Sequence, residues 1–98
     1  MTLEELKKVP FRFRAHLAMA HEHTCTYESE DGRLAFCDHT PKREDGTFGR
    51  TYRHWRIDSR VYKSKQKFLE AIKEFDPNSE FDYGGITEIT DKLRRAGR

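Results

Sequence analysis

Between residues 11 and 57, apolar and polar side chains alternate in several short stretches. In the clearest stretch, apolar residues hold every odd position, and these are Phe11, Phe13, Ala15, Leu17 and Met19. The positions between them carry Arg12, Arg14 and His16. Because successive side chains of a strand point to opposite faces, this period of two predicts a half-buried strand at residues 11–17. A helix that starts at Pro10 is the alternative, since Ala, Leu and Met favour helices.

Similar stretches predict the rest of a sheet. We expect further strands at residues 22–29, 34–39 and 50–57, with a short pairing at 61–62. The dipeptide Asp31-Gly32 lies between the first two of these strands and favours a type I′ hairpin turn. Residues 40–49 contain a proline and two glycines among charged residues, which predicts a mobile loop.

Helical signals flank these strands. Thr2 and Glu5 fit a capping box, which predicts a short helix over residues 3–8. Ser64 is a typical N-cap for a second helix that runs to about residue 75. An apolar stripe at helical spacing supports this second helix: Phe68, Leu69, Ile72 and Phe75. A short third helix is predicted from the amphipathic spacing of Ile86, Ile89 and Leu93, with Gly97 closing it.

Together these elements predict an α+β fold. A short N-terminal helix precedes an antiparallel meander sheet of three or four strands, which packs on one helix from the C-terminal half. We expect residues 1–76 to form a single domain and residues 77–98 an extension with the short terminal helix. Leu, Ile, Val and Phe account for only 19 of the 98 residues, so the core is thin. Trp55 is therefore expected to be largely buried against Phe68 and Ile72.

Two observations argue against a membrane or secreted protein. No apolar run approaches the ~18 residues that are needed to span a bilayer. The first ten residues carry acidic side chains where a secretion signal has basic residues and then an apolar stretch. We therefore expect a cytoplasmic protein without a membrane partner, in which Cys25 and Cys37 are reduced thiols.

Charge is distributed in blocks, although the net charge is only +2. Residues 50–67 carry a net charge of +6 and residues 68–91 carry −6. Arg outnumbers Lys by 11 to 8, and a guanidinium group can bind a phosphate through two hydrogen bonds. The blocks therefore favour a surface for anions such as nucleic acid, or alternatively solvated faces that form salt bridges with each other.

The block of +6 is also rich in aromatic residues. In a strand at residues 50–57, Trp55 and Ile57 share the face that suits the core, so the alternate side chains point to solvent. Lys65 and Lys67 follow in the first turn of the second helix, where the helix dipole favours anions. There they would bind phosphate together with free N–H groups, or simply extend into water. The candidate nucleic-acid-binding residues are Arg12, Arg14, Arg50, Tyr52, His54, Arg56, Lys65 and Lys67.

The predicted order of elements resembles two nucleic-acid-binding layouts. A helix, three strands and a helix that opens with lysines, as Lys63-Ser64-Lys65-Gln66-Lys67 does here, resembles a double-stranded-RNA-binding domain. Strands followed by a helix also resemble the three-stranded-sheet DNA-binding domains of integrase arms and AP2-type factors. These resemblances cover roughly residues 2–75, and each implies a nucleic-acid partner.

Two His–Cys pairs flank Asp31 symmetrically, with His23 and Cys25 before it and Cys37 and His39 after it. A three-residue turn would place Cys25 opposite Cys37 and gather all four side chains on one face, as a set of ligands suited to zinc. A two-residue turn would instead place the cysteines on opposite faces and collect apolar side chains into one stripe. We expect no metal or cofactor, and the alternative metal ligands are His23, Cys25, Cys37 and His39.

The sequence contains no nucleophile elbow, phosphate-binding loop or dinucleotide fingerprint. A Cys–His pair from the turn region, or a ribonuclease site from His16, His54 and a lysine, is the catalytic alternative. We expect no enzyme, but a small binding module that contacts DNA or RNA through a basic, aromatic sheet face. The alternative is a protein–protein adaptor or inhibitor of a mobile-element or phage type. It would use the acidic residues 70–91 or the loop that contains Phe48.

Overall fold

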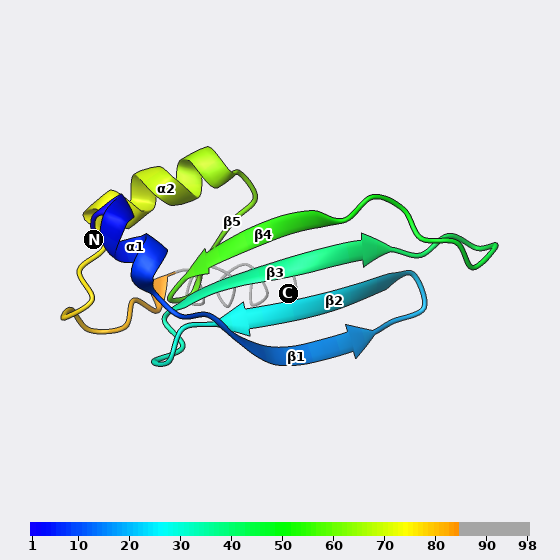
Figure 1. The fold of residues 1–98 in the computed structure, drawn as a ribbon, viewed down its shortest axis with the longest axis horizontal. Coiled ribbons are helices and arrows are strands. Elements are labelled where there is room, and N and C mark those ends of the chain that lie inside the picture. The colour runs from blue at the N-terminus through cyan, green and yellow to red at the C-terminus, as the bar shows by residue number, and fades with distance from the viewer. Residues whose placement is uncertain (85–98) are drawn as a thin grey trace, which may run out of the picture.

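In the computed structural model, which describes residues 1–84, the chain forms two helices and five strands (Figure 1). In chain order these are α1 (Leu3–Lys8), β1 (Arg12–Ala18), β2 (Glu22–Glu28), β3 (Leu34–Pro41), β4 (Tyr52–Ile57), β5 (Arg60–Tyr62) and α2 (Lys65–Glu74). Neighbouring strands pair antiparallel in the order β1-β2-β3-β4-β5. The α+β class and the meander are thus confirmed, with five strands instead of three or four. The terminal helix predicted from Ile86, Ile89 and Leu93 lies outside the described residues.

Both helices begin at the predicted capping residues. In α1, Thr2 Oγ1 accepts a hydrogen bond from Glu5 N, and Thr2 N donates to the Glu5 carboxylate at 3.0 Å. In α2, Ser64 Oγ accepts from Lys67 N. α1 has no fully buried residue, whereas α2 buries two, so α2 is the helix that supplies the core. Neither of these helices of residues 1–84 is long and apolar enough to cross a membrane.

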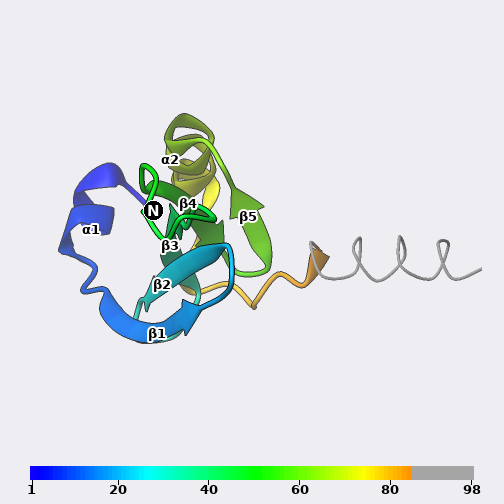
Figure 2. The same cartoon turned by 90° about the vertical axis from the view of Figure 1, so that its right-hand side faces the viewer.

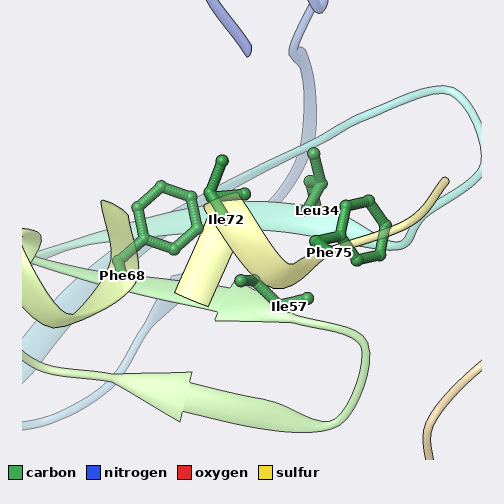
Figure 3. Close-up of a cluster of buried hydrophobic side chains, with 5 residues drawn as sticks. All are labelled: Leu34, Ile57, Phe68, Ile72 and Phe75. Carbon is green, nitrogen blue, oxygen red and sulfur yellow. The ribbon is translucent and has the colours of Figure 1, made fainter. Parts of the chain in front are cut away.

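The core is a small cluster between α2 and one face of the sheet (Figure 3). Five side chains form it, each 8% exposed or less: Leu34, Ile57, Phe68, Ile72 and Phe75. Figures 1 and 2 show that α2 lies over one end of the sheet, where it contacts β4 and β5. Trp55 stacks on Phe68 with 6.0 Å between the ring centroids, as predicted, but it is half-buried. The expectation of a largely buried Trp55 therefore holds in part, because the ring packs on the cluster but lies at its margin.

A buried ion pair fastens the segment after α2 to the sheet. Arg33 Nε and Nη2 donate to the two carboxylate oxygens of Asp58 at 2.8 and 2.9 Å, and both side chains are less than 10% exposed. Arg33 also donates to the carbonyl oxygens of residues 77, 79 and 80, and Asp58 accepts from Asp82 N. Residues 77–82 are therefore bonded to the sheet, while the domain boundary at residue 76 stays a prediction.

β1 departs from the predicted alternation at Arg14. This residue is a β-bulge, an extra residue between the pairs that Phe13 and Ala15 make with β2. The bulge shifts the alternation by one position, so that His16 shares the face of Phe13 and Leu17 lies on the other face. The predicted division of β1 into one apolar and one polar face is therefore wrong beyond Phe13. The prediction of a half-buried strand is also wrong, because every residue of this edge strand is exposed.

The β2–β3 turn has the predicted position but a different type. Gly32 has a φ of 74°, but Asp31 does not have the positive φ that a type I′ turn requires. Ser29 N donates to Leu34 O at 2.8 Å and closes a loop of four residues. The strand register is nevertheless the one that a two-residue turn would produce.

The predicted loop at residues 40–49 is partly strand and partly a hydrogen-bonded turn. β3 continues to Pro41, and Lys42 then forms a bridge with Phe48. Arg43 N donates to Thr47 O at 2.8 Å, and the Arg43 guanidinium donates to Phe48 O at 2.8 Å. This β3–β4 hairpin extends the sheet to the end that lies farthest from the helices (Figure 1).

Candidate nucleic-acid interface

The strand register divides the side chains of the sheet between two faces. Leu34, Trp55 and Ile57 face α2, and we call the other face the open face, because neither helix of residues 1–84 packs on it. The side chains of the open face form three rows across β1 to β4. The first row is Arg12, Glu28, Ala35 and Arg56, the second is Ala15, Thr26, Cys37 and His54, and the third is Leu17, Thr24, His39 and Tyr52.

The structure brings together only part of the predicted interface. Four of the predicted residues lie on the open face: Arg12, Tyr52, His54 and Arg56. Arg14 reaches this face from the bulge, with its Nε 3.9 Å from the Glu28 carboxylate, and Arg50 is exposed just before β4. Lys65 and Lys67 are exposed on α2, in the layer on the other side of the sheet. These two lysines are therefore not part of the open face.

Glu28 lies between the arginines of the first row. Arg56 Nη2 donates to Glu28 Oε1 at 3.1 Å and to a carbonyl oxygen of the β2–β3 turn at 3.2 Å, and Arg56 Nη1 donates to Asp58 O. The Arg56 side chain is 28% exposed, whereas that of Arg14 is 74% exposed. Arg56 thus supports the fold, and the cations on this side that are open to solvent are Arg12 and Arg14.

A second acid, Glu22, is the centre of a polar cluster beside the third row. Tyr52 Oη donates to Glu22 Oε1 at 2.5 Å, and His39 Nδ1 lies 3.2 Å from the same oxygen. The rings of His39 and Tyr52 stack with centroids 4.9 Å apart, and the His54 ring centroid is 4.5 Å from that of His39. Together with Cys37, which pairs with His54 across the strands, we call these residues the His39 cluster.

Hydrogen bonding and burial shift the pKa of three groups in the His39 cluster. The hydrogen bond between Tyr52 and Glu22 lowers the pKa of Glu22 and raises that of Tyr52. Burial, with the charges of His39 and Lys63, lowers the pKa of His54 from its ordinary value of 6.5. At neutral pH, Glu22 is therefore a carboxylate and His54 is a neutral imidazole.

The open face is hollowed next to this cluster. A pocket of about 250 Å³ is lined by residues that include Ala35, Cys37, His54 and Val61. Thr26 Oγ1 donates to Cys37 Sγ at 3.4 Å on its floor, and Ala35 is only 3% exposed. The middle of the open face thus carries small side chains, which allow a ligand to approach the sheet closely.

The cysteines and histidines beside the β2–β3 turn do not converge. Cys25 pairs with Asp38 rather than with Cys37, so the two cysteines lie on opposite faces, as the two-residue register predicts. Within residues 1–84, no group of three His, Cys, Asp or Glu side chains is arranged to hold a metal ion. His16 and His54 also lie on opposite faces, which separates the two histidines of the ribonuclease alternative.

Sequence reasoning missed both acids of the open face, Glu22 and Glu28. The signal was present, because the two-residue register places Glu28 beside Ala35 and therefore on the face of Arg56. It also missed Lys63, whose charge contributes to the low pKa of His54. The open face is therefore less basic than the arginine pattern alone predicts.

Comparison of the chain with protein-family models, with curated proteins and with solved structures finds no match. The expected resemblance of its layout to RNA- and DNA-binding domains therefore finds no support in these comparisons. What the chain binds has to be argued from the charge and shape of the open face itself.

Proposed function

We propose that this chain is a small cytoplasmic nucleic-acid-binding module that contacts its ligand through the open face. The observation that carries this proposal is the distribution of exposed charge on that face. Arg12 and Arg14 are exposed along β1, while Glu28 is paired with Arg56 and Glu22 is bonded to side chains of β3 and β4. A phosphate backbone that binds to this face would therefore contact exposed guanidinium groups. The acids of the face would repel it little, because their charges are already paired.

The dimensions of the open face also support a nucleic-acid ligand. β1 and β4 are three strand spacings apart, about 14 Å. This separation is comparable with the ~12 Å width of a DNA major groove. In this proposal Arg14 on the β1 side and Lys63 on the β4 side contact two phosphate backbones, with Thr26 and Cys37 on the strands between them, and Arg50 extends the contacts along the sheet.

In this proposal the predicted residues divide into contacts and supports. Arg12, Arg14 and Arg50 are exposed and each binds a phosphate, and so does the exposed Lys63, which was not among the predicted residues. Arg56 and Tyr52 are supports, because their side chains donate hydrogen bonds to Glu28 and Glu22 of β2 and so fix the positions of these acids on the face. Lys65 and Lys67 contribute to binding only if the ligand extends around the β5 edge of the sheet and reaches α2.

A mobility-shift assay at several salt concentrations tests the proposal. With four phosphate contacts, affinity for a DNA duplex should fall about 150-fold between about 50 and 200 mM salt. Arg14→Ala should weaken binding and flatten the logarithmic salt dependence by about one unit. Lys73→Ala is the matched control, because it removes an exposed cation from α2 on the other side of the sheet.

Two results of this assay would contradict the proposal. The first is the absence of binding at low salt to single- and double-stranded DNA and RNA. The second is an equal loss from Arg14→Ala and Lys73→Ala, which would mean that net charge attracts the nucleic acid and that the open face has no special role.

A protein partner is the second candidate, and the exposure of β1 favours it. Phe13 and Leu17 are each 59% exposed on this edge strand, and Phe48 is 52% exposed on the β3–β4 hairpin. Exposed apolar side chains of this size are typical of protein contact surfaces when they gather in a patch. Such binding would depend little on salt and would be weakened by Leu17→Ser, whereas Arg14→Ala would change it little.

A further inference from the structure

The His39 cluster contains titratable groups that the proposed phosphate contacts do not use. Both ring nitrogens of His39 are buried without an aligned hydrogen bond to any of residues 1–84, although Nδ1 lies 3.2 Å from Glu22 Oε1. A contact of this kind is strongest when the ring carries a proton and the carboxylate is charged. His39 is thus a buried imidazole held beside a carboxylate, within the proposed binding face.

His54 is the neighbouring imidazole, but its surroundings disfavour a proton. Its ring centroid lies 4.5 Å from that of His39 and 5.4 Å from that of Tyr52. Burial and the charges of His39 and Lys63 lower the pKa of His54, and only the more weakly acting Glu22 opposes them. Among the residues that the structure describes, no second carboxylate stands beside His54 in the free protein, because Glu22 is already in contact with Tyr52 and His39.

Groups from every neighbouring element face His54. They are Glu22 from β2, Cys37 and His39 from β3, Tyr52 and Arg56 from β4, and Lys63 from the β5–α2 connection. Arg56 is already paired with Glu28, and Cys37 accepts a hydrogen bond from Thr26. Within residues 1–84, this environment lacks a second negative charge near the His54 ring.

We propose that nucleic acid bound to the open face supplies that charge, so that His54 takes up a proton from solvent when the complex forms. This inference rests on the proposed function. A phosphate held by Lys63, whose charge acts on the His54 ring, offsets the cations around that ring. The protonated ring then becomes a further cation of the interface, and affinity rises as the pH falls.

The pH dependence of binding to a short fluorescent DNA duplex tests this inference between about pH 5.5 and 8. The uptake of one proton raises affinity by up to about tenfold for each unit of decreasing pH. This rise occurs between the pKa of His54 in the free protein and its higher pKa in the complex. His54→Asn should remove the dependence. His16→Asn is the matched control, since it removes an exposed imidazole from the other face, and it should keep the dependence.

Two further measurements separate proton uptake from loss of folding. NMR titration of the His54 ring should show that its pKa rises when the duplex is added to the folded protein. Glu22→Gln removes the carboxylate that favours the proton, so the rise in affinity should move to lower pH in this variant.

The outcomes distinguish the inference from the function on which it rests. If His54→Asn binds with an unchanged pH dependence, or if the duplex leaves the pKa of His54 unaltered, the proton linkage is wrong and the binding function stands. If no duplex binds at any pH, the proposed function and the proton linkage both fall.

Discussion

At the end of the sheet that α2 covers, five apolar side chains are 8% exposed or less, whereas at the far end Leu17, Met19 and Phe48 are about half exposed. The covered end also contains the buried pair of Arg33 and Asp58. The far end is held by strand pairing and by ring contacts at the surface, such as the one between His23 and Phe48. The buried contacts that stabilise the fold are therefore concentrated under α2.

The largest effect on stability is expected from Ile72→Ala. Ile72 is 0% exposed at the centre of the covered end, so its truncation leaves a cavity. The free energy of unfolding should fall by about 4 kcal/mol, much of the ~5–15 kcal/mol available to a domain. Urea unfolding followed by circular dichroism measures this loss. A loss below about 1 kcal/mol would show that α2 does not cover the core as described.

A somewhat smaller loss, about 3 kcal/mol, is expected from Arg33→Met. This change leaves the Asp58 carboxylate buried without its partner and releases the segment at residues 77–82. Adding Asp58→Asn should recover part of the loss, because the unpaired charge is then removed as well. If thermal melting shows no recovery in the double variant, the loss comes from the released segment and not from the unpaired charge.

The pH dependence of the free energy of unfolding reports on two regions of the unmodified protein, through His54 on the open face and Asp58 at the covered end. The pKa of His54 is lowered by burial, so the unfolded chain binds the proton better and stability falls as the pH drops below 6.5. The pKa of Asp58 is lowered by Arg33, so its contribution is lost only as the pH falls below 3.8. Chemical unfolding at a series of pH values should show both declines. His54→Asn should remove the first and keep the second, and persistence of the first would assign it to another group.

The smallest effect is expected from Phe48→Ala at the far end. The ring is 52% exposed and contacts His23 at the surface, so the loss should stay below about 0.5 kcal/mol. The same urea titration that is used for Ile72→Ala provides the measurement. Equal losses in the two variants would mean that the far end belongs to the core.

The parts of the fold that depend on local sequence were predictable. The cap residues Thr2 and Ser64 start their helices as expected, because a capping side chain acts within three residues of its own position. The stripe of α2 and the face that carries Ile57 also follow from periodicity alone. Each of these predictions needs only neighbouring residues, and each is confirmed.

The faces of β1 and the charge balance of the open face could not be predicted in this way. A bulge depends on how a strand pairs with its partner, and nothing in the alternation around Arg14 indicates one. His16 was therefore predicted on the wrong face of the sheet. The pairing of Arg56 with Glu28 depends on a register that the sequence left open between two turns. The strands that carry the candidate site could therefore be predicted from the sequence. The acids that neutralise its arginines were identified only in the structure.

The bulge at Arg14 affects the tendency of the protein to aggregate at high concentration. Within residues 1–84, β1 has no strand partner on its outer side, and an open edge of this kind invites aggregation. The extra residue interrupts the regular row of backbone donors and acceptors, so a second chain cannot continue the ladder across it in register. Two such edges would also bring Arg12 and Arg14 of one copy close to those of another. We therefore expect concentrated solutions to stay free of edge-to-edge polymers, despite the exposed Phe13 and Leu17.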